Sequence, residues 1–427
     1  MKRTFQEIKK KVTAGKANVL TAKEVEEFLE SGNETEVRKA DIITCGTMGT
    51  MSGTYALLCF DISEAGRYRK FVKARINGVP ATVGPCPNEN LGIIDLMIFG
   101  TTESSDSSNY GGSFLFRDLA EGQDVSVSAV SEDGHEIETS LSVKDMSTAK
   151  LLSTRNCFRN YRAFVNPSDE DIRSIFCSHP FPPKYNGLTF SGCGHINPLQ
   201  NDPKLITVGV GTKILFNGSE GFVYGMGTRS SDKYPNIMSV ANIKEMDPSL
   251  MGGFMTAAGP ECLTTYAIPI PVLNDDLLKN IMIRDKDIPL SVCDVRDRHK
   301  IGQADYGQVW TGNDDSVNFD SASCLKCPVC YARRACPTFA IEINDGAPRV
   351  DHSRCVNCGV CIDICPGKCF RGIMGKVMTH IDGMEMTIPV VCRNSNREGA
   401  IRSMTDLKNK ILDKEFVITE KVSDINH

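Results

Sequence analysis

The chain has no long hydrophobic run and little net charge, and both absences exclude classes of protein. No stretch approaches the roughly 18 apolar residues that a membrane-spanning helix needs. The N-terminal residues carry charges without a continuous apolar core, so we expect no secretory signal. The formal net charge is −5, whereas nucleic-acid and anionic-membrane surfaces require a basic excess. We therefore expect a cytoplasmic protein that binds neither nucleic acid nor membrane.

The common nucleotide-binding loops and the serine triad are also missing. Gly209, Gly211, Gly225 and Gly227 form two Gly-x-Gly steps, but these do not match the dinucleotide fingerprint. Tight turns explain them, and a nest of backbone amides for a small anion is the alternative. Neither a Walker loop nor a Ser-His-Asp elbow is found.

Cysteine, in contrast, is abundant, with 18 residues in 427. Cytoplasmic thiols are kept reduced, so these cysteines indicate metal ligands or reactive thiols before disulfides. Eight of them form two motifs, each followed by proline. The motifs are Cys324-x2-Cys327-x2-Cys330-x5-Cys336 and Cys355-x2-Cys358-x2-Cys361-x3-Cys365. This doubled pattern is typical of a bacterial-type ferredoxin-like module with two [4Fe–4S] clusters.

The spacing also predicts which cysteines share a cluster. Three thiolates of one motif bind three irons of a cluster, and the fourth ligand comes from the other motif. One predicted set is Cys324, Cys327, Cys330 and Cys365. The other set is Cys336, Cys355, Cys358 and Cys361. A structural zinc site is the alternative, but zinc needs only four ligands.

The chain before the cysteine motifs predicts a mixed α/β domain over residues 1–311. A capping box at Thr21-Ala-Lys-Glu24 opens a helix. Short apolar runs predict strands near residues 41–44, 91–95 and 124–130, and three β-rich pieces between 205 and 227. A strand, a helix and a strand are expected at 268–273, 275–282 and 288–295.

The cysteine module is predicted to be an insertion in that domain. Residues 312–323 are polar and mark a boundary, which places the module at 312–373. The segment 374–427 is not ferredoxin-like: 378–391 reads as a hairpin and 401–412 as an amphipathic helix. We expect this segment to return to the first domain.

Two further cysteines are candidate catalytic thiols. Cys45 and Cys193 stand between or beside glycines, which let the backbone approach a ligand and leave amides facing a thiolate. His195 is near enough in sequence to Cys193 to be its acid or base. The alternative for each cysteine is a small residue in a tight turn.

A cluster of arginines predicts an anion-binding region. Arg155, Arg159 and Arg162 surround Cys157, and Arg229 lies farther along the chain. Guanidinium groups bind anions through paired hydrogen bonds. We therefore predict that these arginines hold an anionic substrate, and a solvated basic helix face is the alternative.

Residues 109–122, 191–228, 388–403 and 407–420 resemble the homocysteine-biosynthesis family of sulfur-incorporating enzymes. The fused ferredoxin motifs make the chain similar to the methanogenesis marker protein 16 branch of that family. The resemblance implies reductive thiolation of a small anionic aldehyde, with a sulfide or persulfide donor and a low-potential electron donor as partners. For this branch it implies coenzyme M made from sulfoacetaldehyde, and for other members homocysteine made from aspartate semialdehyde.

The chain departs from the family at two cysteine positions. A persulfide-carrying cysteine is expected within residues 129–137, which contain none, and Ser52 stands where another cysteine is expected. We therefore assign the sulfur-carrying role to Cys193 or Cys45 as a hypothesis based on local chemistry. A hypothesis of another class is a non-catalytic iron–sulfur electron carrier or metal-handling scaffold.

Overall fold

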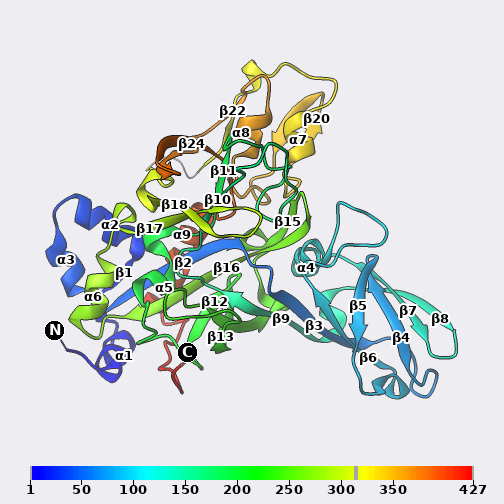
Figure 1. Ribbon diagram of the computed structural model, residues 1–427. Coiled ribbons are helices and arrows are strands. Elements are labelled where there is room, and N and C mark those ends of the chain that lie inside the picture. The colour runs from blue at the N-terminus through cyan, green and yellow to red at the C-terminus, as the bar shows by residue number, and fades with distance from the viewer. Residues whose placement is uncertain (1, 312–315, 426–427) are drawn as a thin grey trace.

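The structure is a computed structural model that describes residues 2–311 and 316–425. Its body is a long mixed sheet with the strand order β1-β2-β16-β12-β13-β14-β9-β3-β6-β5-β4-β7-β8, and β15 pairs with β16 (Figure 1). β1 and β2 pair in parallel, and the other described pairs of this sheet are antiparallel. The strands are β1 (Val19–Thr21), β2 (Ile42–Thr50), β3 (Thr54–Asp61), β4 (Phe71–Ile76), β5 (Val79–Val83), β6 (Ile93–Phe99), β7 (Val125–Ser131), β8 (Glu136–Leu141), β9 (Met146–Asn156), β12 (Lys213–Phe216), β13 (Ser219–Met226), β14 (Ile237–Asn242), β15 (Gly252–Thr256) and β16 (Gly259–Pro271).

A second, smaller sheet has the order β18-β17-β10-β11-β24-β23 and its own apolar core. β10 pairs in parallel with β17, and β11 in parallel with β24, so the segment after the cysteine motifs lies beside a strand from residues 188–190. The strands are β10 (Ala163–Val165), β11 (Leu188–Phe190), β17 (Pro289–Asp294), β18 (Lys300–Asp305), β23 (Lys376–Ile381) and β24 (Met384–Arg393).

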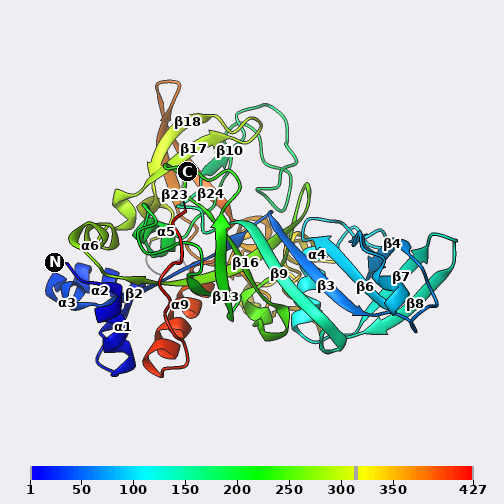
Figure 2. The same ribbon diagram turned by 90° about the horizontal axis from the view of Figure 1, so that it is seen from below.

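Most helices lie at one end of the large sheet, whereas α4 (Gly112–Ala120) lies farther along it near β6, as Figure 2 shows. The others are α1 (Phe5–Thr13), α2 (Ala22–Glu30), α3 (Glu34–Lys39), α5 (Pro198–Asn201), α6 (Asp275–Ile281) and α9 (Arg397–Leu412). α9 packs against β2, where a Cβ at Gly46 would collide with the carbonyl oxygen of Ala400. The glycine therefore permits the close approach of helix and strand.

The cysteine motifs form a small body that lies beside β11 and β15 in Figure 1. It contains α7 (Tyr331–Ala335), α8 (Val360–Ile364) and the strands β19 (Asn318–Phe319), β20 (Ile341–Asn344), β21 (Ala347–Val350) and β22 (Phe370–Arg371). β19 pairs with β22 and β20 with β21, so each cysteine loop and its helix lie between two short strands. We call residues 316–373 the cysteine module; the start of its expected boundary, 312–315, lies outside the described residues.

The predicted mixed α/β character is confirmed, and so is the capping box, in which Thr21 and Glu24 each bind the other's backbone N–H. The expectation of three β-rich pieces within 205–227 is wrong, since only β12 and β13 form there. The Asp202 carboxylate accepts the N–H groups of Ile206, Thr207 and Val208. These donors are thus satisfied without a strand partner. None of the described helices is long and apolar enough to cross a membrane.

Candidate active site and cysteine module

Three arginines converge on a small cavity of about 80 Å³ between the two sheets. We call it the arginine pocket; Arg155, Arg229 and Arg298 line it together with Ser52 and Glu261. Arg155 lies in β9, Arg229 follows β13, and Arg298 lies in the loop between β17 and β18. Arg229 and Arg298 have φ angles of 66° and 65°. A left-handed backbone at a non-glycine residue costs about 1–2 kcal/mol, and such residues gather at functional sites.

Two of the four predicted substrate-binding arginines line this pocket, and two do not. Arg155 and Arg229 are in the lining, whereas Arg159 donates to the Gln200 side chain at 3.1 Å. Arg162 donates to the backbone oxygen of Arg298 at 2.9 Å. It therefore supports the backbone of a pocket arginine and does not line the pocket itself. Arg298 was missed because its polar loop sequence is typical of an ordinary surface turn.

Among the described residues that line the pocket, Glu261 is the only acidic one. It is buried on β16, and its Oε2 atom has no hydrogen-bond partner among the described residues. Burial raises the pKa of Glu261 to about 7, although the Ser52 hydroxyl and the nearby Arg155 and Arg298 act in the opposite direction. A carboxyl group with this pKa can give or take a proton at neutral pH. The signal that sequence reasoning overlooked is a glutamate within an otherwise uncharged strand.

The two candidate thiols lie deeper than the pocket. The Cys193 thiol accepts a hydrogen bond from Thr47 and donates one to the Met48 backbone oxygen, both at 3.6 Å. Cys45 lies on the same face of β2 as Thr47, because alternate strand residues share a face. Both cysteines are wholly buried, and burial raises the pKa of both thiols above the ordinary value. Thr47 itself lines the pocket, so Cys193 is one side chain away from it. Their catalytic role stays a prediction.

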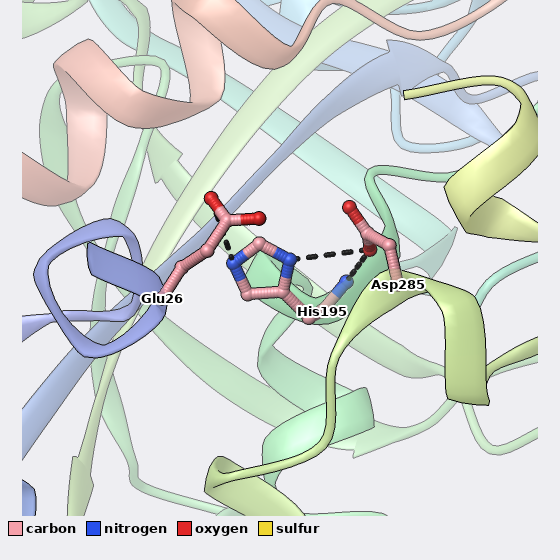
Figure 3. Close-up of side chains that lie close together, drawn as sticks. All are labelled: Glu26, His195 and Asp285. Carbon is pink, nitrogen blue, oxygen red and sulfur yellow. Dashed lines mark hydrogen bonds and ion pairs between the residues drawn. The ribbon is translucent and has the colours of Figure 1, made fainter. Parts of the chain in front are cut away.

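His195 belongs to a buried ion-pair network, drawn in part in Figure 3. Its Nδ1 atom lies 3.1 Å from Asp285 Oδ1, and its Nε2 atom lies 3.7 Å from Glu26 Oε2. These three side chains have the spacing of a metal site. However, the Arg397 guanidinium contacts both Asp285 and His195, so a cation is already present there. Opposing the effect of burial, Arg397 and His195 hold the pKa of Asp285 well below its usual range.

This network joins four segments around the Cys193 loop, and its removal tests that role. We expect Arg397→Leu to lower the free energy of unfolding by about 3 kcal/mol, since it removes the guanidinium that pairs with the buried Asp285 carboxylate. The folded-state pKa of Asp285 lies below that of the unfolded chain, so this stabilisation is present above about pH 4 and lost as the pH falls. Denaturant titrations at pH 7 measure the change. Arg38→Leu, which removes an exposed pair with Glu34, is the control, with an expected effect below about 0.5 kcal/mol. Equal losses in both variants would contradict a special role for the network.

In the cysteine module, the cysteines gather at two separate hollows. One hollow is lined by Cys324, Cys327, Cys330 and Cys365, with Cys369 beside them. The other is lined by Cys336, Cys355, Cys358 and Cys361. In both hollows, therefore, cysteines of the two motifs meet.

The backbone around these sulfur atoms suits thiolate ligands. Lys326 and Asn357, each just before the second cysteine of its motif, both have a left-handed backbone. Phe339 and Lys368, which each follow the last cysteine of their motif by three residues, also have a left-handed backbone. Backbone N–H groups bind the sulfur atoms of Cys336, Cys355, Cys358 and Cys365. Such donors stabilise the charge on cluster ligands, so the donor sets fit iron–sulfur clusters.

The stretch where a persulfide-carrying cysteine is expected lies far from the pocket. Residues 129–137 span the end of β7, the turn after it and the start of β8, and none of them is among the described residues that line the pocket. Figures 1 and 2 show this hairpin at the opposite end of the large sheet from α9. Ser52, which stands at the second position where a family cysteine is expected, lines the pocket.

Comparisons with known proteins cover nearly the whole chain. The family described as "Homocysteine biosynthesis enzyme, sulfur-incorporation" matches residues 17–418. A protein of Methanothermobacter thermautotrophicus described as uncharacterized is 42% identical over 97% of this chain and 94% of its own length. The L-aspartate semialdehyde sulfurtransferase of Methanosarcina acetivorans is 30% identical over 73% of this chain and 63% of its own length.

The cysteine module has its own relatives. The polyferredoxin-like subunit of the aliphatic sulfonate oxidoreductase of Pyrococcus furiosus is 39% identical over 13% of this chain and 32% of its own length. No solved structure matches the chain. The residues matched by this relative and the two hollows together support the presence of iron–sulfur clusters.

Proposed function

We propose that this chain, which belongs to the homocysteine-biosynthesis family of sulfur-incorporating enzymes, makes a small thiol by reductive thiolation of an anionic aldehyde. The overall reaction joins the aldehyde RCHO with H₂S, two electrons and two protons to give RCH₂SH and H₂O. The C=O bond breaks, a C–S bond forms, and the aldehyde carbon is reduced. The observation that carries the proposal is a small pocket with three arginines and a carboxyl group of raised pKa.

The charge of the pocket favours sulfoacetaldehyde, which would make coenzyme M the product. A sulfonate has three oxygen acceptors, and guanidinium groups bind such oxyanions through paired hydrogen bonds. Arg155, Arg229 and Arg298 would supply these donors. A cavity of about 80 Å³ suits a molecule of a few heavy atoms better than a larger substrate.

Glu261 would supply the proton. When sulfide attacks the carbonyl carbon, negative charge develops on the carbonyl oxygen, and a protonated carboxyl group can neutralise it. The raised pKa of Glu261 keeps a large fraction protonated at pH 7. The two [4Fe–4S] clusters that we expect in the cysteine module would supply single electrons at low potential when bound.

Homocysteine formation is the second candidate, because relatives are named L-aspartate semialdehyde sulfurtransferases. Aspartate semialdehyde carries an ammonium group, which needs an anionic partner. Glu261 is the acidic residue among the described lining residues, and an ionised Glu261 could not also donate the proton. The arrangement therefore supports the sulfonate more than the amino acid.

An anaerobic assay decides between these substrates. Purified protein with its clusters is incubated with sulfide, a low-potential reductant and either aldehyde, and thiol products are identified by mass spectrometry. We expect thiol from sulfoacetaldehyde at a kcat/KM at least tenfold above that for aspartate semialdehyde, about 1.4 kcal/mol of discrimination. The reverse order would favour homocysteine formation. Consumption of neither aldehyde would favour a non-catalytic electron carrier.

The pocket arginines provide a second test. Arg298→Gln and Arg229→Gln are each expected to raise KM for sulfoacetaldehyde about 10–100-fold, because each loses a charged hydrogen bond of about 1.5–3 kcal/mol. Steady-state kinetics measure the change. Arg69→Gln is the control, since Arg69 is 84% exposed and far from the pocket lining. An unchanged KM in both pocket variants would exclude the arginines as the sulfonate site.

A further inference from the structure

An uninterrupted row of apolar side chains crosses one face of the large sheet. From β13 through β14, β9 and β3 to β6, successive strands place them directly opposite one another: Phe222, Val240, Leu152, Tyr55 and Phe99. Directly opposite residues of antiparallel strands share one face of a sheet. Figure 2 shows four of these strands, β13, β9, β3 and β6, along the sheet. The row therefore spans five strands on a single face.

Three more residues widen this row on the same face. Leu57 is directly opposite Met97. Leu57 and Tyr224 each follow a member of the row by two residues, and alternate residues of a strand share a face. We call the row and these three residues the apolar face. None of its eight residues is charged, and four of them are between 37% and 46% exposed.

The area of the apolar face suits a contact between proteins. A fully exposed large side chain has roughly 200 Å² of surface, so the face and its rim present about 600 Å². Soluble monomers rarely expose a contiguous apolar patch larger than a few hundred Å². Two such faces in contact would bury about 1,200 Å² in total, which is where the range of specific, stable interfaces begins. The face is therefore large enough to hold a second copy of the chain.

Two charged residues at the rim favour a second copy over another protein. Lys150 is directly opposite Leu57, and Asp61 lies four residues after Leu57 in β3, about 13 Å along the strand on the same face. Neither has an ion-pair partner among the residues that the structure describes. In a two-fold contact, a residue of one copy meets a different residue of the other copy, and the reverse contact also forms. A basic and an acidic residue on one face can therefore pair twice across such an axis.

We propose that the apolar face joins two copies of this chain in a two-fold dimer, with Lys150 of each copy against Asp61 of the other. The two sheets pack face to face, as the sheets of a sandwich do. Aromatic residues and methionine are enriched at the cores of protein interfaces and charged residues are depleted, which matches the apolar face. Arg155 lies in β9 and Arg229 follows β13, so the second copy covers two strands that lead to the arginine pocket.

Sedimentation velocity of the full-length holoprotein, measured without oxygen over a range of concentrations, tests this contact. We expect the wild type to sediment with twice the mass of one chain. Phe222→Glu and Phe99→Glu should each sediment as monomers, because each would place a carboxylate in the apolar contact. Met384→Glu is the control and should stay dimeric, since Met384 is 63% exposed but lies in the smaller sheet. Circular dichroism checks that each variant is folded.

Charge reversal at the rim provides a test that leaves the apolar residues in place. Lys150→Glu and Asp61→Lys each bring like charges together at two places in the dimer, so we expect each to raise the Kd of dimerisation at least about tenfold. The double variant restores opposite charges in exchanged positions, and its Kd should return to within about threefold of the wild type. A double variant that dimerises no more tightly than the single variants would overturn the pairing of Lys150 with Asp61.

Two other outcomes would overturn the proposal as a whole. A wild-type chain that stays monomeric at every concentration would assign the apolar face to a different protein. Dimers of Phe222→Glu and Phe99→Glu as tight as the wild type would place the contact elsewhere on the chain. No aldehyde is present in these measurements, so none of the results bears on the proposed thiol-forming reaction.

Discussion

Replacing Cys365 by serine is expected to remove the cluster of the first motif, although Cys365 belongs to the second motif. The wild type should hold about eight irons per chain, four for each cluster. Cys365 lines one hollow with Cys324, Cys327 and Cys330, so its loss should halve the iron and the acid-labile sulfide. Thiol formation should be lost, because the electron route is then incomplete. Iron analysis and electron paramagnetic resonance of the reduced protein measure this outcome.

The neighbouring Cys369 makes a second variant necessary. Its sulfur lies 3.2 Å from that of Cys365, so a variant that lacks both thiols is needed to show that Cys369 does not substitute as a ligand. We therefore expect Cys369→Ser alone to keep all of the iron, and the Cys365→Ser/Cys369→Ser double variant to hold about four irons per chain. Cys336→Ser should lose the complementary half and keep the spectrum of the other cluster. Iron near eight in the double variant would refute the exchange of ligands between the motifs.

Glu261→Gln is expected to lower kcat about 100-fold or more, the usual contribution of a positioned acid–base group. Glutamine keeps the size and polarity of the side chain but cannot give up a proton in this way. Because burial raises the pKa of Glu261 to about 7, the wild type should be active below this pH and lose activity as the pH rises through it. Rate measurements from pH 5.5 to about 9 follow the decline, which the variant should not show.

Two controls separate proton donation from a change in structure. KM for the aldehyde should change less than kcat in Glu261→Gln, since the arginines that bind the anion remain. Ser52→Ala removes a hydroxyl group that lowers the pKa of Glu261, so we expect the activity to persist to higher pH in that variant. A pH profile that is the same in wild type and both variants would rule out Glu261 as the proton donor.

Features that depend on near neighbours in the chain followed from the sequence. The spacing of the cysteine motifs is a local pattern, and the structure places their cysteines at two hollows in which the motifs meet. The capping box at Thr21 and the strand–helix–strand order from β16 to β17 depend on contacts within a few residues. The strand missing before β12 shows the limit, because a single carboxylate, that of Asp202, binds the backbone donors instead.

The arginine pocket was only half foreseen, because its parts come from distant segments. Arg155 and Arg229 were predicted from a cluster of basic residues, but nothing in the sequence separates them from Arg159, whose side chain binds Gln200. Arg298 reaches the pocket from a loop of the smaller sheet, and Glu261 from β16 of the larger one. Their meeting depends on how the two sheets pack, which no local pattern encodes.

The sequence by itself therefore determined the cysteine module, the family and the alternation of helices and strands, since local spacing and propensity decide these. Only the tertiary structure placed Glu261 in a buried setting that raises its pKa, and brought Arg298 to the pocket that Arg155 and Arg229 line. Burial and long-range contact are properties of strand pairing and sheet packing. For that reason the chemistry of the pocket could be read only from the folded chain.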